Sequence, residues 1–204
     1  LESAGMKRFM KDLKPSCMDD IIAGISLYRP GPMDFIPKFV KNKQDPEHIE
    51  YDDPCLVDIL DVTYGCIVYQ EQVMKIFQVM GGYSLGQADN IRRIMGKKKV
   101  AQIAKERVKF VNGWDEPEGK KSIPGAVKLG HDKAVAEKIF DEMKEFAKYA
   151  FNKSHAAAYA YVSYQTAYLK CYYEVEFITA VLNNRITNAD NLTKYINYAK
   201  SEGI

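Results

Sequence analysis

The feature that most constrains the fold is a helical repeat of apolar residues between positions 83 and 110, whose polar side is strongly basic. Ser84 followed three positions later by Gln87 is a capping-box pattern, so a helix is expected to begin near Leu85. Apolar residues then recur at the spacing of one helical face, at Leu85, Ala88, Ile91 and Met95.

A second helix is expected to complete this unit. Gly96 is placed to end the first helix in a left-handed backbone conformation, which a residue with a side chain would resist. The second helix should follow and turn four side chains partly inward, Val100, Ile103, Val108 and Phe110. The segment is therefore predicted to form two consecutive amphipathic helices.

Positive charge is concentrated on this helix pair. From position 89 to 109, eight Lys or Arg residues stand against Asp89 and Glu106, a local charge of +6 in a chain whose net charge is +2. Arg forms paired hydrogen bonds with phosphate, and Lys adds a mobile positive charge. This pattern indicates a phosphate site for a nucleoside triphosphate, a nucleic-acid backbone or both. A solvated basic helix pair without a ligand is the alternative.

The two adjacent arginines of this unit are expected to have different roles. Arg92 and Arg93 point about 100° apart on a helix. Arg93 lies nearly opposite the apolar face, whereas Arg92 lies on its flank.

Helical periodicity recurs along the rest of the chain and predicts a mainly α fold with a short β-like run at 66–69. The Gly and Pro residues of 112–130 predict a mobile loop. Trp114 in this loop either packs the loop onto the body of the protein or stacks on a base. Ser154 is expected to cap a helix from His155 to about Tyr172. That helix is apolar almost all round, so burial is favoured over base stacking for its tyrosines.

Composition excludes several classes of protein. The longest strongly apolar stretch, 156–162, is too short to span a membrane, and the start of the chain lacks a signal-peptide pattern. Four cysteines show no metal-ligand spacing and three histidines are scattered, so reduced thiols and no zinc site are predicted. The acidic segment 45–61 is read as solvated turns rather than a metal site. A start at Leu1 without Met suggests a piece of a longer protein.

Several motifs, taken together and in order, indicate more than composition does. They are LYRPGPM at 27–33, TYGCIVYQEQVM at 63–74, GYSLG at 82–86, RRIMGKKK at 92–99, FNKSHAAAY at 151–159 and SYQTAYLK at 163–170. In this order and spacing they closely resemble the C family of replicative DNA polymerases, the alpha subunits of bacterial DNA polymerase III. The resemblance covers about 1–184.

The resemblance implies a domain division and a function. It implies a helical fingers domain at 31–186, preceded by a palm-proximal helical segment at 1–30 and followed by a helix at 187–204 that leads out of the fingers. Fingers of this family close over the incoming deoxynucleoside triphosphate and help hold the template–primer during bacterial chromosome replication. The parent protein is then a DNA-directed DNA polymerase. Its two Mg²⁺ ions are held by palm carboxylates N-terminal to this chain, so the isolated chain is expected to be inactive.

The resemblance also implies site residues. Those for the incoming nucleotide are Arg92, Arg93, Lys97, Asn152, Lys153, Ser154 and His155. Those for DNA are Lys98, Lys99, Lys105 and Arg107. No catalytic residue and no metal ligand is expected in this chain. A rigid His155 side chain would exclude a ribose 2′-hydroxyl by crowding, and a histidine that only caps and packs is the alternative. Tyr69, Gln70 and Gln72 match a family motif without an assigned role.

Partners and location follow from the same resemblance. The parent protein is expected in the bacterial cytoplasm, at the nucleoid-associated replisome, with a sliding clamp, a clamp loader and a proofreading subunit, and away from membranes. The alternative function is a stand-alone helical module that binds nucleic acid without catalysis, in which case binding should weaken steeply with salt.

Overall fold

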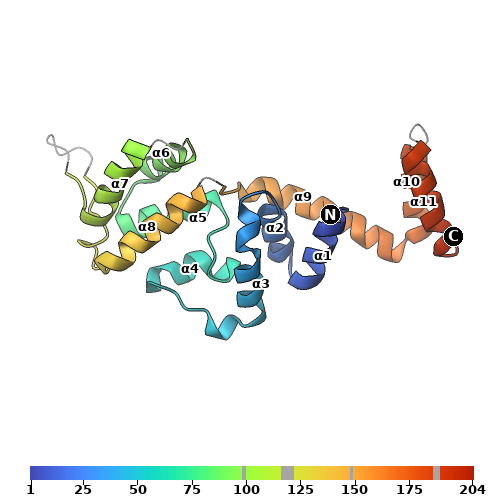
Figure 1. Ribbon diagram of the computed structural model, residues 1–204, viewed down its shortest axis with the longest axis horizontal. Coiled ribbons are helices and arrows are strands. Elements are labelled where there is room, and N and C mark those ends of the chain that lie inside the picture. The colour runs from blue at the N-terminus through green and yellow to red at the C-terminus, as the bar shows by residue number, and fades with distance from the viewer. Residues whose placement is uncertain (98–99, 116–121, 148, 186–188) are drawn as a thin grey trace. The chain divides into compact units, whose positions relative to one another are not determined.

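The computed structural model describes residues 1–97, 100–115, 122–147, 149–185 and 189–204. The chain divides into two compact units, Leu1–Ala157 and Ala158–Ile204, and the boundary falls within a helix. Both units are built from helices (Figure 1), which confirms the mainly α prediction.

The described residues of the first unit form eight complete α-helices and the start of a ninth. They are α1 (Ala4–Leu13), α2 (Met18–Leu27), α3 (Ile36–Gln44), α4 (Val57–Leu60), α5 (Gln70–Gly81), α6 (Leu85–Gly96), α7 (Val100–Asn112), α8 (Lys133–Ala147) and α9 (Lys153–Tyr172). Short 3-10 turns lie at Pro32–Phe35, Pro46–His48, Pro54–Leu56 and Asp61–Thr63. In the described parts of the chain, β structure is limited to two isolated bridges, and the β-like run at 66–69 pairs only through Tyr69.

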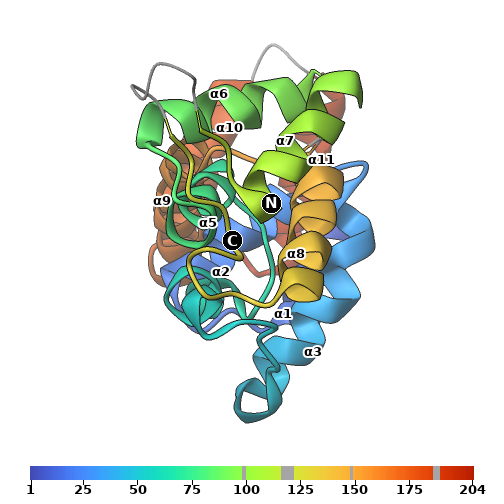
Figure 2. The same ribbon diagram turned by 90° about the vertical axis from the view of Figure 1, so that its left-hand side faces the viewer.

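Aromatic side chains fill the core between helices α5, α7 and α8. Figure 2 shows these three helices grouped with α6. The buried Phe77 ring of α5 lies 5.2 Å from Tyr83, 5.2 Å from Phe110 of α7 and 6.0 Å from Phe140 of α8, measured between ring centroids. All three pairs meet edge to face, the arrangement that the ring quadrupoles favour. This cluster joins three helices and supports α6.

Helix α6 begins as the capping box predicts. Ser84 Oγ accepts a hydrogen bond from Gln87 N at 3.3 Å, and Gln87 Oε1 accepts one from Ser84 N at 2.8 Å. Leu85 was expected inside but is 60% exposed, because it lies in the first turn, where a side chain leans back toward the helix N-terminus. The other three predicted inward residues are buried, namely Ala88, Ile91 and Met95.

The end of α6 differs from the prediction. Gly96 is absent from the residues with positive φ, so its predicted left-handed conformation is wrong. The next residue, Lys97, has φ −83° and its N–H donates to Arg93 O at 3.1 Å, so the chain stays right-handed through the end of the helix. A left-handed glycine cap does occur at the end of the preceding helix α5, where Gly82 has φ 74°.

The buried face of α7 is shifted by part of a turn from the predicted one. Ile103 and Phe110 are buried as expected, but Val108 is 59% exposed and Val111 is buried. Successive residues of an α-helix are rotated by about 100° around its axis. At this spacing Val111, rather than Val108, shares the buried face with Phe110. The side chain of Val100 lies outside the described residues.

Helix α9 begins two residues earlier than predicted. Asn152 Oδ1 accepts a hydrogen bond from His155 N at 3.0 Å, so Asn152 caps the helix and Ser154 is an exposed residue of its first turn. Asn is as good an N-cap as Ser.

The described parts of the 112–130 loop are packed, which corrects the prediction of a mobile loop for them. Trp114 and Ile123 exchange backbone hydrogen bonds of 2.8 and 2.7 Å. Ala126 N donates to Phe110 O at 2.8 Å, and both Ile123 and Ala126 are buried. Residues 116–121 lie outside the described residues.

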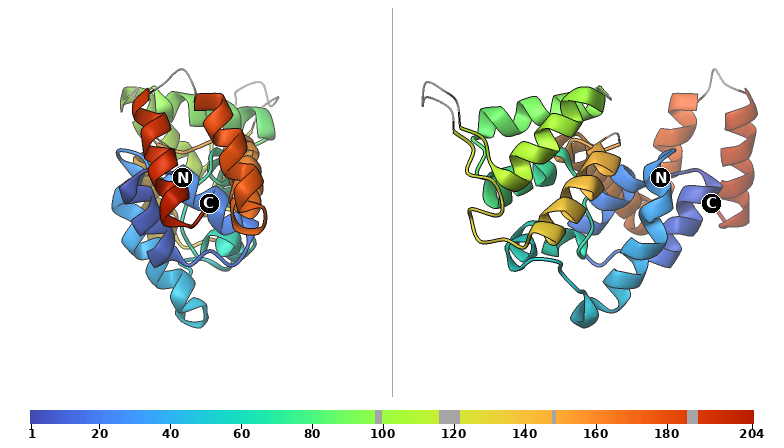
Figure 3. Two further views of the ribbon diagram at one scale, coloured as in Figure 1. Left: turned by 90° about the vertical axis from the view of Figure 1, so that its right-hand side faces the viewer. Right: turned by 60° about the vertical axis from the view of Figure 1, so that its left-hand side comes forward.

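The second unit contains the rest of α9, α10 (Glu174–Arg185) and α11 (Ala189–Ser201). Figure 3 shows α10 and α11 side by side, and Tyr198 Oη of α11 donates to Glu174 Oε1 at 2.7 Å. The prediction that the tyrosines of α9 are buried is wrong, because their exposed fractions run from 45% for Tyr168 to 68% for Tyr172. Periodicity detects an apolar surface but does not say what covers it.

No helix of the described chain is both long enough and apolar enough to cross a membrane.

Asp20 anchors the N-terminal part of the first unit. Its buried carboxylate accepts hydrogen bonds from Ser16 N at 2.7 Å, Cys17 N at 3.2 Å and Tyr64 Oη at 2.8 Å, and Lys43 Nζ lies 3.0 Å away. The carboxylate that caps the start of α2 therefore belongs to Asp20. Burial alone would raise the pKa of the Asp20 carboxyl, but these hydrogen bonds outweigh it and lower the pKa to about 2.

Replacing Asp20 is expected to remove a pH-dependent part of the stability. Because the folded pKa of about 2 lies below the ordinary aspartate pKa of 3.8, this carboxylate stabilises the fold above pH 4 by about 2 kcal/mol, and that stability is lost as the pH falls toward 2. Urea unfolding between pH 7 and pH 2 should show a gap between wild type and Asp20→Asn that shrinks over this window. A gap independent of pH would contradict the assignment.

Two glycines should respond oppositely to alanine. Gly125 has φ 81°, and a Cβ there would lie 2.1 Å from Gly113 N, so Gly125→Ala is expected to lower the free energy of unfolding by roughly 1–3 kcal/mol. Gly86, in the first turn of α6, has no atom within 4 Å of such a Cβ, so Gly86→Ala should raise it by roughly 0.4–1 kcal/mol. Chemical denaturation measures both, and equal effects would contradict the close approach of the two loop segments.

Candidate functional site

A junction between two distant segments lies where α5 begins. Tyr69 forms a parallel bridge with Phe151, in which Gln70 N donates to Phe151 O at 3.0 Å and Phe151 N donates to Val68 O at 3.3 Å. The Gln70 side chain extends this pairing, because its Nε2 donates to Ala150 O at 3.0 Å. The start of α5 thereby holds the residues that lead into α9.

Gln72 fixes the backbone on the α5 side of this junction. Its buried Oε1 accepts hydrogen bonds from Val68 N at 2.8 Å and Tyr69 N at 2.9 Å. Its Nε2 donates to Thr63 Oγ1 at 2.7 Å and to Ile59 O at 3.1 Å. Every polar atom of this amide is therefore used, and the run before α5 has a single register.

Arg92 reaches the same junction from α6. Its terminal Nη1 donates to Gln70 Oε1 at 3.0 Å, so one amide links Arg92 to Ala150 O. The other side of the guanidinium, Nε and Nη2, donates to Asp89 Oδ1 at 3.0 and 2.7 Å. Arg92 is thus held by two polar side chains in one orientation.

The two arginines differ in exposure as predicted. The Arg92 side chain is 21% exposed and that of Arg93 is 64% exposed. They nevertheless share one partner, because Arg93 Nη2 lies 2.7 Å from Asp89 Oδ2. Hydrogen bonding from Arg92 keeps the pKa of the Asp89 carboxyl below its ordinary value, and the charge of Arg93 adds to the effect.

The 152–155 segment lies on the other side of the junction. Lys153 N donates to the Glu71 carboxylate at 3.3 and 3.4 Å, and Lys153 Nζ lies 3.0 Å from Asp19 Oδ1. The His155 ring centroid lies 5.3 Å from that of Phe151. Ser154 and His155 are exposed at the start of α9.

Arg29 supports this segment from the LYRPGPM motif. Its Nε donates to Ser26 O at 3.0 Å and its Nη2 to Tyr149 O at 2.8 Å, while Cζ lies 4.1 Å above the Phe151 ring centroid. The sequence pattern assigns no individual role to Arg29. The cation over the ring and the carbonyl contact show why an arginine stands in this turn.

The remaining predicted site residues are more dispersed. Lys97 is exposed directly after α6, and Lys105 is exposed on α7. Arg107 of α7 is paired with α8, its Nη2 lying 3.4 Å from Glu137 Oε2 and 3.0 Å from Asp141 Oδ2. Lys98 and Lys99 lie outside the described residues.

A shallow hollow between α6, α7 and the loop is a separate feature. Its volume is about 130 Å³, and its lining includes Tyr83, Asn90 and Trp114. Ligand sites for drug-sized molecules are usually about 300–1,000 Å³, so the hollow is too small for a nucleotide. Lys109 Nζ lies 4.6 Å above the Trp114 ring centroid, and the loop backbone is paired at the same residue, which favours packing of Trp114 over base stacking.

Comparison with known families decides the identity of this fold. Residues 1–118 match the model of the bacterial DNA polymerase III alpha subunit finger domain. The chain belongs to this family. The identification confirms the resemblance drawn from the motifs, and it identifies the helix pair α6–α7 as part of a finger domain.

Curated relatives support the same family over the whole chain. The DNA polymerase III subunit alpha of Borreliella burgdorferi is 47% identical over 203 residues, covering 100% of this chain and 17% of that protein. Those of Xylella fastidiosa and Treponema pallidum are 49% and 48% identical, covering 98% and 100% of this chain and 16% of each relative. The chain therefore spans about a sixth of the length of these relatives.

The predicted division of this finger-domain chain at 30/31 and 186/187 stays a prediction. The family model matches from residue 1, and the compact units meet at Ala157 and Ala158.

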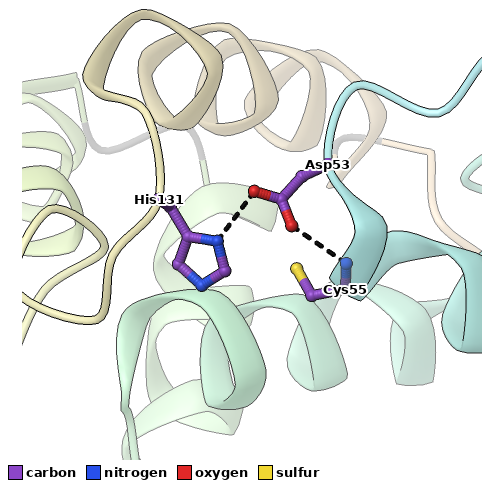
Figure 4. Close-up of side chains that lie close together, drawn as sticks. All are labelled: Asp53, Cys55 and His131. Carbon is purple, nitrogen blue, oxygen red and sulfur yellow. Dashed lines mark hydrogen bonds and ion pairs between the residues drawn. The ribbon is translucent and has the colours of Figure 1, made fainter.

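The described residues do not fit the two Mg²⁺ ions that the family resemblance implies. Among them, a single set of three or more His, Cys, Asp or Glu residues has its ligand atoms within 4.8 Å of one another, and it consists of Asp53, Cys55 and His131 (Figure 4). Mg²⁺ prefers an octahedron of oxygen ligands, whereas this set offers one carboxylate, one thiol and one imidazole. No step through Mg²⁺ is therefore assigned to these residues.

Proposed function

We propose that this chain forms the fingers of a DNA-directed DNA polymerase, where it binds the incoming deoxynucleoside triphosphate and helps hold the template–primer during bacterial chromosome replication. One observation carries the proposal: the Gln70 amide joins Arg92 of α6 to Ala150 O, beside the start of α9. The two groups of residues that the motifs indicate for the nucleotide are thereby held by one hydrogen-bonded junction, although they lie far apart in the sequence.

The phosphate end of the nucleotide is assigned to α6. Phosphoryl transfer depends mostly on positioning and on neutralising phosphate charge. Arg93 is the more exposed arginine and Arg92 the more firmly held, so Arg93 makes first contact and Arg92 fixes the orientation. Lys97 adds charge at the exposed end of the helix, and Asp89 holds both guanidinium groups until the triphosphate competes for them.

The sugar and base end is assigned to the start of α9. Asn152, Lys153, Ser154 and His155 form its cap and first turn. The His155 ring lies against Phe151, which Arg29 covers from the other segment. A ring restrained in this way is suited to exclude a ribose 2′-hydroxyl by crowding.

DNA is assigned to the cations that follow. Lys105 is exposed on α7, and Lys98 and Lys99 precede that helix in the sequence. Arg107 is engaged by Glu137 and Asp141, so its contact with DNA requires exchange of these carboxylates for phosphate. We infer that carboxylates outside this chain bind Mg²⁺ and that the isolated chain is inactive. We place the parent protein at the cytoplasmic replisome, with its clamp, clamp loader and proofreading subunit.

Replacing either α6 arginine should weaken use of the nucleotide. In the full-length polymerase, Arg92→Ala and Arg93→Ala are each expected to reduce kcat/KM for the deoxynucleoside triphosphate by a factor that corresponds to roughly 1–3 kcal/mol, the value of a hydrogen bond between charged groups. Single-nucleotide incorporation kinetics measure this loss. Arg8→Ala is the matched control, because Arg8 is an exposed arginine on α1.

Unchanged nucleotide kinetics in both variants would contradict the proposal. Weaker, salt-dependent DNA binding with unchanged nucleotide kinetics would instead support the alternative of a nucleic-acid-binding module.

A further inference from the structure

A second cluster lies away from the proposed nucleotide residues, between the turn before α4 and the loop before α8. Asp53 is 8% exposed and begins the Pro54–Leu56 turn, where its Oδ1 accepts a hydrogen bond from Cys55 N at 2.9 Å. His131 comes from the loop before α8, and its Nδ1 lies 2.7 Å from Asp53 Oδ2. Figure 4 shows the Cys55 sulfur directed toward these two groups.

The three side chains offer one oxygen, one sulfur and one nitrogen, and these atoms all lie within 4.8 Å of one another. Ligand atoms bound to a tetrahedral zinc ion at about 2.0–2.3 Å lie roughly 3–4 Å apart, so small side-chain movements would complete three corners of a tetrahedron. With the thiol deprotonated, the set carries two negative charges, which match a divalent cation. Sulfur and imidazole nitrogen favour zinc over magnesium or calcium.

Hydrogen bonds and an ion pair hold the two segments in place without a metal. His131 N donates to Ala126 O at 3.0 Å, and the neighbouring Asp52 forms an ion pair of 2.6 Å with Lys138 of α8. Asp53 is fixed by the Cys55 N–H. A site whose ligands are already positioned loses less conformational entropy on binding an ion.

We propose that Asp53, Cys55 and His131 bind a zinc ion that ties the turn before α4 to the loop before α8. The ion displaces the Nδ1 proton of a neutral His131 imidazole, and this proton moves to Nε2, so that Asp53 Oδ2 and His131 Nδ1 both face the ion. The thiol proton passes to solvent, so one proton is released for each zinc ion bound. Cys55 and His131 are partly exposed, which gives the ion and water access to the cluster.

The electrostatics of the cluster explain why metal binding would be needed to ionise the thiol. Burial, aided by the charge and hydrogen bonding of Asp53, raises the pKa of the Cys55 thiol to about 12. A divalent cation reverses this effect, because it stabilises the thiolate as a ligand. Without the ion, the cluster is a hydrogen-bonded Asp–His pair with a neutral thiol beside it, and this is the alternative that the test must separate.

The test uses Co²⁺ as a coloured substitute for zinc. The metal-free 204-residue chain is titrated with Co²⁺ while near-ultraviolet thiolate-to-cobalt absorption and visible tetrahedral bands are recorded, and Zn²⁺ is then added as a competitor. We expect one equivalent of Co²⁺ to give both signals and Zn²⁺ to abolish them. In Cys55→Ser the thiolate band should vanish, and in His131→Asn the affinity should fall by at least about 100-fold.

Cys171→Ser is the matched control, because Cys171 is an exposed free thiol elsewhere in the chain and its loss should leave the titration unchanged. Circular dichroism establishes that each variant is folded. Should Cys55→Ser not fold, the wild-type titration still decides, with native mass spectrometry giving the stoichiometry. No thiolate band in the wild type, or an equal band in folded Cys55→Ser, would overturn the proposal.

Discussion

The structure of the proposed site depends on one side-chain amide. Gln70 accepts a hydrogen bond from Arg92 with its oxygen and donates one to Ala150 O with its nitrogen, both at 3.0 Å. Because the two bonds use opposite ends of the same planar group, moving α6 would strain the entry into α9. Gln72 fixes the backbone on which Gln70 stands, through four hydrogen bonds of a buried amide. A buried network in which every polar atom is satisfied specifies one arrangement.

Helices α6 and α7 carry less unpaired positive charge than their composition indicates, because carboxylates neighbour several of their Lys and Arg side chains. Arg92 and Arg93 share Asp89, Arg107 is paired with Glu137 and Asp141, and Lys109 lies 3.1 Å from Glu106. These exposed and half-exposed pairs are individually weak. They orient the cations, and a triphosphate carrying several charges can displace a single carboxylate. In the proposed function, the carboxylates therefore prepare the arginines for the ligand.

The sequence predicts local features well and long-range ones poorly. The Ser84–Gln87 capping box and the buried Ala88, Ile91 and Met95 follow from spacing within one helix, and all are observed. The pairing of Tyr69 with Phe151 joins single residues from distant segments, so the periodicity of the sequence cannot predict it. The same holds for Asp53 and His131, which come together across 78 positions. The prediction that the α9 tyrosines are buried failed for the same reason, since an apolar pattern does not identify the surface that it packs against.

The most direct measurement is a double-mutant cycle between Gln70 and Arg92 in the full-length polymerase, with the dissociation constant of the incoming nucleotide obtained from single-turnover incorporation. If Gln70 acts by holding Arg92, Gln70→Ala should weaken nucleotide binding, and the loss in the double variant should be smaller than the sum of the two single losses. Gln78→Ala, on the same helix α5, is the control and should have no effect. A normal dissociation constant in Gln70→Ala, or losses that add in the double variant, would contradict the account.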